Sequence, residues 1–248
     1  MMRIAGMMRV RNESRWIARS LASLKPLCNA GLFVFDDRST DDTAAIARSA
    51  GAQVINDPFD GLDETRDKNH LVRHVFNAAH PQWIVHIDGD ESLEASGVAE
   101  LSPLLQAAPV SISAYALRVI YLWDSELQMR IDGVYSTLTR PSIFRTSGTD
   151  LVFRNLAAAK SGFHCGNIPS DLHPRTATCS VRLKHFGYID RELRLRKYAF
   201  YNANDPNNDV EDRYRHAVQG DLPEVPANAR LRHAGPLTLA PYLERGVR

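Results

Sequence analysis

The chain has 248 residues and a formal net charge of +1 at pH 7. This length suits one large domain, or one domain with an appendage, and the balanced charge excludes general nucleic-acid binding, which requires a strong basic excess. The three cysteines form no pair at metal-ligand spacing, the first residues show no signal-peptide pattern, and the most apolar long window, 101–123, is interrupted by proline and arginine. We therefore expect a cytoplasmic protein without a transmembrane span.

Strands and helices are predicted to alternate through the first half of the chain. Residues 4–10, 32–35 and 52–56 are short apolar runs typical of strands. The helix after the first strand places four apolar residues on one face: Trp16, Ile17, Leu21 and Leu24. This alternation predicts an α/β fold with a mostly parallel central sheet and helices on both of its faces.

The second helix carries start and stop signals. Ser39 stands where an N-cap is expected, with Asp42 three residues on, close to a capping box. Gly51 is placed to end the helix in a left-handed conformation. Both signals predict a helix between the second and third strands.

A third helix is predicted over residues 63–80, and its first turn holds Arg66 and Lys68. Cationic side chains and free backbone N–H groups at a helix start both suit a phosphate group. Solvated charges on the helix surface are an equally simple interpretation of the two residues.

The acidic residues Asp88, Asp90 and Glu91 directly follow a predicted interior strand, residues 83–87. In an open α/β sheet ligands bind at the carboxyl ends of the strands, and side chains two apart on an extended chain point the same way. Clustered carboxylates repel each other unless a positive charge joins them, which indicates a divalent metal. Ordinary turn chemistry is the alternative for an Asp-Gly-Asp sequence.

The second half of the chain is less regular. Residues 115–123, 138–145 and 180–188 are predicted strands, and a basic helix is expected over residues 190–201. Residues 146–180 show no clear period. The last segment, 204–248, is polar and contains prolines, so we expect a loose tail or an extension.

Three motifs in the first half carry a family resemblance: RNES after the first strand, FDDRSTDDT after the second and HIDGDES after the fourth. Their order resembles family 2 glycosyltransferases with the GT-A fold, over roughly residues 7–92, and the late stretch LKHFGYIDRELRLRKYAFYNANDP resembles the histidine region of bacterial members. The resemblance implies a single GT-A domain over residues 1–203. Its nucleotide-sugar half would be 1–92 and its acceptor half 93–203.

The resemblance also implies roles for individual residues. Asp37 would accept a hydrogen bond from the nucleotide base, and Arg11 and Glu13 of the first motif, with Arg66 and Lys68, would contact the nucleotide. Asp90 would bind Mn or Mg directly, Asp88 would contact the ribose or the metal, and His185 would be the third metal ligand. A packed or capped histidine is the alternative for His185.

An inverting transfer needs a general base, which this family usually supplies as an acidic residue between the DxD motif and the late histidine. Five acidic residues are available: Asp124, Glu126, Asp132, Asp150 and Asp171. Asp171 is our choice, because it lies in the irregular stretch where an acceptor loop is expected. Where many relatives have an acidic residue after a histidine, this chain has Cys165.

The resemblance implies a metal-dependent transfer of a sugar from a nucleoside diphosphate sugar, of UDP or GDP type, to a hydroxyl acceptor. The acceptor would be a glycan or glycolipid in bacterial surface polysaccharide or glycolipid synthesis. The basic helix would bind acceptor phosphates or an anionic membrane surface at the inner face of the membrane; a solvated helix face is the alternative. Two other functions stay open: a non-catalytic nucleotide-sugar-binding module, and a sugar nucleotidyltransferase, although RNESR lacks the glycine-rich loop of the latter.

Overall fold

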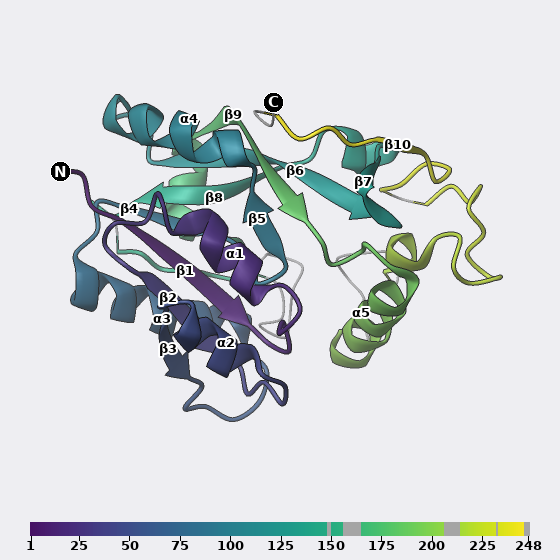
Figure 1. The fold of residues 1–248 in the computed structure, drawn as a ribbon, viewed down its shortest axis with the longest axis horizontal. Coiled ribbons are helices and arrows are strands. Elements are labelled where there is room, and N and C mark those ends of the chain that lie inside the picture. The colour runs from purple at the N-terminus through teal and green to yellow at the C-terminus, as the bar shows by residue number, and fades with distance from the viewer. Residues whose placement is uncertain (148–149, 156–164, 206–213, 232, 246–248) are drawn as a thin grey trace.

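A computed structural model of the chain describes residues 1–147, 150–155, 165–205, 214–231 and 233–245. Its strands are β1 (Ile4–Val10), β2 (Leu32–Asp36), β3 (Gln53–Asn56), β4 (Trp83–His86), β5 (Glu91–Leu93), β6 (Ala114–Trp123), β7 (Ser125–Arg130), β8 (Thr139–Arg145), β9 (Thr176–His185) and β10 (Leu239–Pro241). Its α-helices are α1 (Ile17–Leu24), α2 (Thr43–Ser49), α3 (Glu64–Ala79), α4 (Ala95–Gln106) and α5 (Arg191–Asn204). Figure 1 shows these elements along the chain.

The strands form one mixed sheet with the order β10-β7-β6-β8-β4-β1-β2-β3, and β9 joins it by pairing with both β5 and β6. Strands β4, β1, β2 and β3 are parallel to their neighbours within that group, and β6 is parallel to β9. Strand β8 runs antiparallel between β4 and β6. The predicted α/β fold is confirmed, and its parallel part is the half that the motifs occupy.

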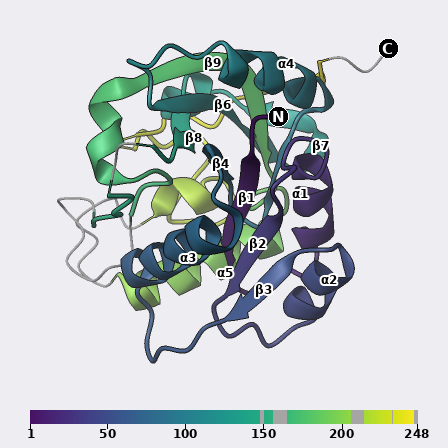
Figure 2. The same cartoon turned by 90° about the vertical axis from the view of Figure 1, so that its left-hand side faces the viewer.

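Helices cover both faces of the parallel strands, as Figure 2 shows for α3 on one side and α1 and α2 on the other. Strand β1 explains this arrangement, because its alternate residues belong to two separate cores. Ile4 and Met8 pack in the core that contains α1, α2 and α4, whereas Ala5 and Met7 pack in the core that contains α3. The predicted helices on both faces are therefore confirmed.

The predicted capping box before α2 is wrong. The helix begins at Thr43, its N-cap is Asp42, and the Asp42 side chain makes no capping hydrogen bond. Ser39 Oγ instead accepts a hydrogen bond from the backbone N–H of Asn12, at 2.9 Å. The loop after β2 is thus bonded to the loop after β1, a long-range contact that the local pattern could not indicate. Gly51, with φ of 89°, follows the C-cap as predicted.

The second half contains elements that the sequence did not indicate. Strand β5 has only three residues and pairs with β9, so that Glu91 lies opposite His185. Helix α4 contains Pro103 in its interior, and β7 shows no clear alternation of buried and exposed residues. The predicted strand over 83–87 ends at His86, which leaves Asp88 and Asp90 in the turn between β4 and β5.

The described residues of the last segment, expected as a loose tail or an extension and called the extension below, pack against the rest of the domain. Strand β10 pairs with β7, and Tyr214, Ala217 and Val218 are buried. The hydroxyl of Tyr242 donates to Glu94 Oε1 at 2.6 Å. The extension adds a strand to the far edge of the sheet (Figure 1).

Among the described residues, none of the helices is long and apolar enough to cross a membrane.

Candidate active site

One pocket of about 600 Å³ lies at the carboxyl ends of the parallel strands. It is lined from β1, from the segments that follow β1, β2 and β4, from α3 and β8, from the loop at residues 165–167, and from β9 and α5. Seven residues predicted from the sequence line it: Arg11, Glu13, Asp37, Lys68, Asp88, Asp90 and His185. The other two, Arg66 and Asp171, are not among its lining residues.

Asp88 lies at the end of β4 and is held by Arg140 of β8. Arg140 Nη1 is 3.1 Å from Asp88 Oδ2, and the same guanidinium pairs with the buried carboxylate of Glu91. The backbone N–H of Asp88 donates to Glu91 Oε2 at 2.9 Å. Burial raises the pKa of Asp88, but Arg140 and Lys68 outweigh it and lower the pKa well below its ordinary value. Asp88 is therefore a fixed negative charge at the pocket wall.

Glu91 is fully buried beneath Asp88, and burial raises its pKa to about 7, against the lowering effect of Arg140. Its Oε1 has no hydrogen-bond partner among the residues that the structure describes. Glu91 therefore fixes the turn between β4 and β5 rather than lining the pocket.

Asp90 is 3% exposed and has two neighbours of different kinds. Its Oδ2 lies 2.6 Å from Lys197 Nζ, in α5, and 3.8 Å from His185 Nε2, at the end of β9. Burial raises the pKa of Asp90, whereas Lys197 and His185 lower it to a net value below the ordinary one. The carboxylate is therefore ionised and already carries one cation of the chain.

His185 is a buried, neutral imidazole. Burial lowers its pKa to about 4, and its ring lies 4.8 Å from the ring of Tyr121 and 5.1 Å from that of Tyr188. Its Nδ1 accepts a hydrogen bond from the backbone N–H of Gly187 at 3.2 Å, so the ring proton is on Nε2. Binding of a metal through Nε2 requires the other tautomer, with the proton on Nδ1.

Glu13 lines the same pocket from the loop after β1. Burial and the neighbouring Asp90 raise its pKa to about 8, although Lys197 and Arg196 oppose this rise. The carboxyl is therefore protonated at neutral pH and can donate a hydrogen bond to a ligand.

Asp37, at the end of β2, is completely buried among arginines. Its carboxylate lies 2.7 Å from Arg9 Nη2, 2.6 Å from Arg38 Nη2 and 3.6 Å from Arg11 Nη1. The guanidiniums of Arg9 and Arg11 also line the pocket. This end of the pocket therefore presents cationic donors fixed by one carboxylate.

Asp37, Asp57 and Asp67 offer oxygen atoms within 4.8 Å of one another, close enough for a shared metal ion. Each carboxylate is already paired with guanidinium groups: Arg9 with Asp67 at 2.9 Å, and Arg38 with Asp57 at 3.1 Å. A metal would have to displace these pairs, which already compensate the buried charges. Asp90 is also paired, with Lys197, but a buried imidazole, His185, lies beside it as a second kind of ligand, which this cluster of aspartates lacks.

Arg66 and Lys68 leave the first turn of α3 in different directions. Arg66 Nη2 pairs with Asp67 at 2.8 Å, and its side chain donates to the carbonyls of Asp60 and Gly61. Lys68 is 4% exposed, and its Nζ donates at 3.2 Å both to the carbonyl of Cys165 and to Asn167 Oδ1. Lys68 thus fixes the loop at residues 165–167, so it is no solvated surface charge.

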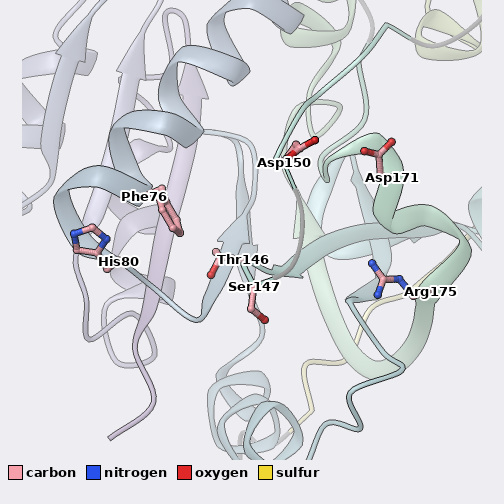
Figure 3. Close-up of a pocket in the computed structure, with 7 residues that line it drawn as sticks. All are labelled: Phe76, His80, Thr146, Ser147, Asp150, Asp171 and Arg175. Atoms are coloured by element: carbon pink, nitrogen blue, oxygen red, sulfur yellow. The ribbon is translucent and has the colours of Figure 1, made fainter.

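Asp171 lies in a second pocket of about 730 Å³. Figure 3 shows its lining residues, with Asp171 among them: Phe76, His80, Thr146, Ser147, Asp150, Asp171 and Arg175. Of the five acidic residues considered as general base, not one lines the first pocket. His173, two residues from Asp171 in the 3₁₀ helix Ser170–Arg175, does line it.

Several lining residues were not indicated by the sequence. Arg140 belongs to none of the sequence motifs. It contacts Asp88 because β8 pairs with β4 in antiparallel orientation. Helix α5 contributes four neighbours on one face: Arg196, Lys197, Phe200 and Tyr201. Their spacing of i, i+1, i+4 and i+5 was a usable signal, since such residues share one side of a helix. Arg194, in contrast, turns away and pairs with Asp221 and Asp124.

Asp37→Asn is expected to weaken binding of a nucleotide by about 1.5–3 kcal/mol, with or without metal, because a charged hydrogen-bond acceptor is lost. The melting temperature should also fall, since Arg9 and Arg38 lose their ionised partner. Calorimetric titration and thermal unfolding measure the two effects. The exposed Asp42, changed to Asn, is the matched control. An unchanged dissociation constant in the Asp37 variant would remove Asp37 from the binding site.

Comparison with known proteins finds a matching family profile and several relatives. The profile described as glycosyl transferase family 2 matches residues 7–163. Protein RfbJ of Shigella flexneri is 34% identical over 91 residues, which cover 36% of this chain and 66% of RfbJ. The uncharacterized glycosyltransferase RP128 of Rickettsia prowazekii is 28% identical over 141 residues, which cover 56% of this chain and 46% of RP128. The chain thus spans less than two thirds of the length of these relatives.

Solved structures resemble the chain in fold. The crystal structure of S. aureus TarS 1-349 in complex with UDP-GlcNAc has a TM-score of 0.51 and 12% sequence identity, over 91% of this chain and 82% of that one. The crystal structure of S. aureus TarS has a TM-score of 0.50 and 14% identity, over 88% and 42%. This likeness supports the expected GT-A fold, and the profile covers more than half of the chain. The chain belongs to glycosyl transferase family 2.

Proposed function

We propose that this protein transfers a sugar from a nucleoside diphosphate sugar, of UDP or GDP type, to a hydroxyl acceptor. One observation carries the proposal: a single pocket joins the arginine-bound Asp37 to the ionised pair Asp88 and Asp90. A nucleotide sugar has its base at one end and its sugar at the other, with the diphosphate between them, so it requires a region for the base and a region for the diphosphate in one cavity. TarS, which shares the fold, was crystallised with UDP-GlcNAc.

A divalent metal, Mn or Mg, is part of this proposal, and the residues around Asp90 fit one. Asp90 Oδ2 and His185 Nε2 are both buried and 3.8 Å apart, too far for a hydrogen bond and near enough to share a cation. Carboxylate and neutral imidazole are suitable ligands for Mn, although His185 must first change its tautomer. When bound, the metal would stabilise the negative charge that develops on the departing diphosphate.

Side chains of this pocket would bind the donor directly. Arg140, Arg196 and Lys197 line the pocket beside Asp88 and Asp90, and their positive charges suit the diphosphate. Such fixed charges favour the transition state, because the leaving-group charge grows as the glycosidic bond breaks. Glu13, protonated at neutral pH, would donate a hydrogen bond to the nucleotide or the sugar.

The general base of the proposed reaction remains a prediction. Asp171 lines the second pocket, whereas His173 lines the same pocket as Asp88 and Asp90. Since a base must reach the acceptor hydroxyl, we expect His173→Gln to lose transfer and Asp171→Asn to retain it. Loss of transfer in the Asp171 variant alone, with donor binding intact, would restore Asp171 to that role.

A non-catalytic nucleotide-sugar-binding module is the second candidate. It is favoured by the absence of all five candidate acids from the first pocket among the described residues. Incubation with a panel of UDP-, GDP-, dTDP- and CMP-sugars and Mn, followed by mass spectrometry, separates the two. Donor breakdown or transfer supports the enzyme, and binding without either supports the module.

A glycan or glycolipid acceptor and a role in bacterial surface polysaccharide or glycolipid synthesis rest on the family resemblance. Action in the cytoplasm rests on the three unpaired cysteines and on the first residues of the sequence. Contact with the inner face of the membrane through α5 is less well supported, since Arg196 and Lys197 face the pocket and Arg194 pairs with Asp221.

His185→Ala is expected to weaken Mn binding and to reduce transfer, while metal-free nucleotide affinity is kept. Because the pKa of His185 is lowered to about 4, its imidazole is neutral above that pH, and Mn affinity in the wild type should persist down to about pH 5. Mn titrations at pH 5 and 7, with the exposed His74→Ala as control, test this. A destabilised His185 variant with an unchanged Mn midpoint would show a packing residue instead.

A further inference from the structure

Helix α5 brings two basic residues, Arg196 and Lys197, into the pocket from a part of the chain far from the three motifs of the first half. Asp190 caps the helix by accepting from the backbone N–H of Leu193 at 2.8 Å. Arg194 anchors the next turn, since its Nη1 donates to the carbonyl of Tyr188 at 2.9 Å and its guanidinium pairs with Asp221. The turn that carries Arg196 and Lys197 is thereby fixed against the pocket.

Lys197 pairs with the oxygen of Asp90 that would bind the metal. Its Nζ lies 2.6 Å from Oδ2, the same oxygen that faces His185 Nε2 at 3.8 Å. The Asp90 side chain is 4% exposed and that of Lys197 19% exposed, so water screens the pair only weakly. The space is tight, because a Cβ atom at Gly187 would collide with Asp90, Lys197 and His185.

A divalent metal and the Lys197 ammonium compete for this oxygen. Asp90 and His185 would hold the metal, and the Lys197 ammonium already lies 2.6 Å from Asp90 Oδ2, the oxygen that faces His185 Nε2. Two cations beside one carboxylate oxygen repel each other strongly away from bulk water. Entry of the metal therefore requires Lys197 to leave Asp90.

A bound diphosphate is a suitable destination for the displaced ammonium. Lysine is a compact charge on a flexible four-carbon stem, so it can move by rotation of its side chain while α5 stays in place. Asp88 is already paired with Arg140, and Glu13 is protonated at neutral pH. A diphosphate bound in the pocket would offer anionic oxygens to both Lys197 and its neighbour Arg196.

We propose that Lys197 is an exchangeable cation of the donor site: it holds Asp90 while no metal is bound, and it binds the donor diphosphate when a metal takes its place. This inference rests on the proposed function, because it assigns a diphosphate to the pocket. It explains how the pocket keeps a buried carboxylate neutralised in both states. It also gives the pocket some affinity for a nucleoside diphosphate in the absence of metal.

Two titrations on Lys197→Met test the inference. In the first, Mn is titrated without nucleotide and free Mn is followed by electron paramagnetic resonance. Removal of the competing ammonium should tighten Mn binding, by about tenfold if one charged hydrogen bond is involved. In the second, UDP and GDP are titrated in EDTA, where the variant should bind the preferred nucleotide about tenfold more weakly than the wild type does.

Two further variants make the result specific. Lys197→Gln, which can still bond to Asp90, serves if Lys197→Met does not fold, and the same two shifts are expected from it. Arg191→Met removes an exposed charge from the same helix outside the pocket and should change neither titration.

The outcomes separate the inference from the proposed function. Tighter Mn binding together with weaker metal-free nucleotide binding supports the inference. An unchanged or weaker Mn midpoint, or unchanged nucleotide affinity in EDTA, overturns it while wild-type binding leaves the proposed function standing. A wild type that binds neither nucleotide under any condition overturns the proposed function itself.

Discussion

Asp90→Asn is expected to abolish metal-dependent nucleotide binding and also to lower the melting temperature of the metal-free protein. The sequence alone suggests relief of carboxylate repulsion, but the structure shows Asp90 paired with Lys197 and Asp88 paired with Arg140. Removing the charge of Asp90 leaves the Lys197 ammonium without its partner. Breaking a buried pair costs about 3–5 kcal/mol, and the partial exposure of Lys197 places this one at the lower end.

Thermal unfolding in EDTA and in Mn, each with and without UDP or GDP, measures both effects of the Asp90 change. Asp60→Asn, at an exposed loop position, is the control and should behave as the wild type does. A normal Mn-dependent stabilisation of the Asp90 variant by nucleotide would show that Asp90 is only a turn residue.

Arg140→Met is expected to have the second largest effect, because one guanidinium compensates two carboxylates. Without it, Asp88 loses its partner at 3.1 Å and the buried Glu91 loses its ion pair, so nucleotide binding and stability should both fall. A stability loss of roughly 3 kcal/mol is expected at pH 8. At lower pH the loss should be smaller, since protonation of Glu91 removes its uncompensated charge.

The stability loss in the Arg140 variant should increase with pH, because of Glu91. The folded-state pKa of Glu91 is about 7 in the wild type, above its ordinary value, and loss of Arg140 raises it further. A carboxyl with a raised pKa contributes stability that is lost as pH rises through that pKa. Urea unfolding at pH 6 and pH 8 should therefore show a larger drop in the variant than in the wild type. Arg140→Lys should restore part of the difference, and an equal drop in both proteins would contradict the assigned pairing.

The well-marked part of the site could be predicted because it depends on local patterns. Strand β4 is a short apolar run, and the residues after it must lie at the carboxyl edge of a parallel sheet, which places Asp88 and Asp90 in the pocket. Asp37 follows β2 in the same way. The late histidine was reached by resemblance, and the pairing of β5 with β9 explains its position, since it sets Glu91 opposite His185.

The rest of the site depends on contacts between distant segments. Arg140 lies 52 residues after Asp88 in the chain and reaches it only because β8 is inserted antiparallel between β4 and β6. Lys197 lies 107 residues after Asp90 and approaches it because the capped start of α5 is anchored to the extension through Arg194 and Asp221. The hydrophobic periodicity of a sequence does not indicate which distant residues come into contact. The amphipathic pattern of α5 showed which residues share a face, but not what that face meets.

The general base shows a different failure. Asp171 was chosen because it lies in an irregular stretch, and that stretch does reach the pocket, through Cys165, Gly166, Asn167 and His173. The segment in which a residue lies does not decide where its side chain points, however. Side chains two residues apart in a 3₁₀ helix point to different sides. Asp171 therefore faces the second pocket while His173 lines the first.

Calorimetric titration of the wild-type protein with UDP, GDP, dTDP and CMP, each in Mn and in EDTA, tests the central claim most directly. A pocket that joins Asp37 to Asp88 and Asp90 should bind at least one nucleoside diphosphate, more tightly in Mn than in EDTA and with weaker but measurable binding in EDTA. Absence of binding by all four nucleotides in both conditions would contradict the assignment of this pocket to a nucleotide-sugar donor.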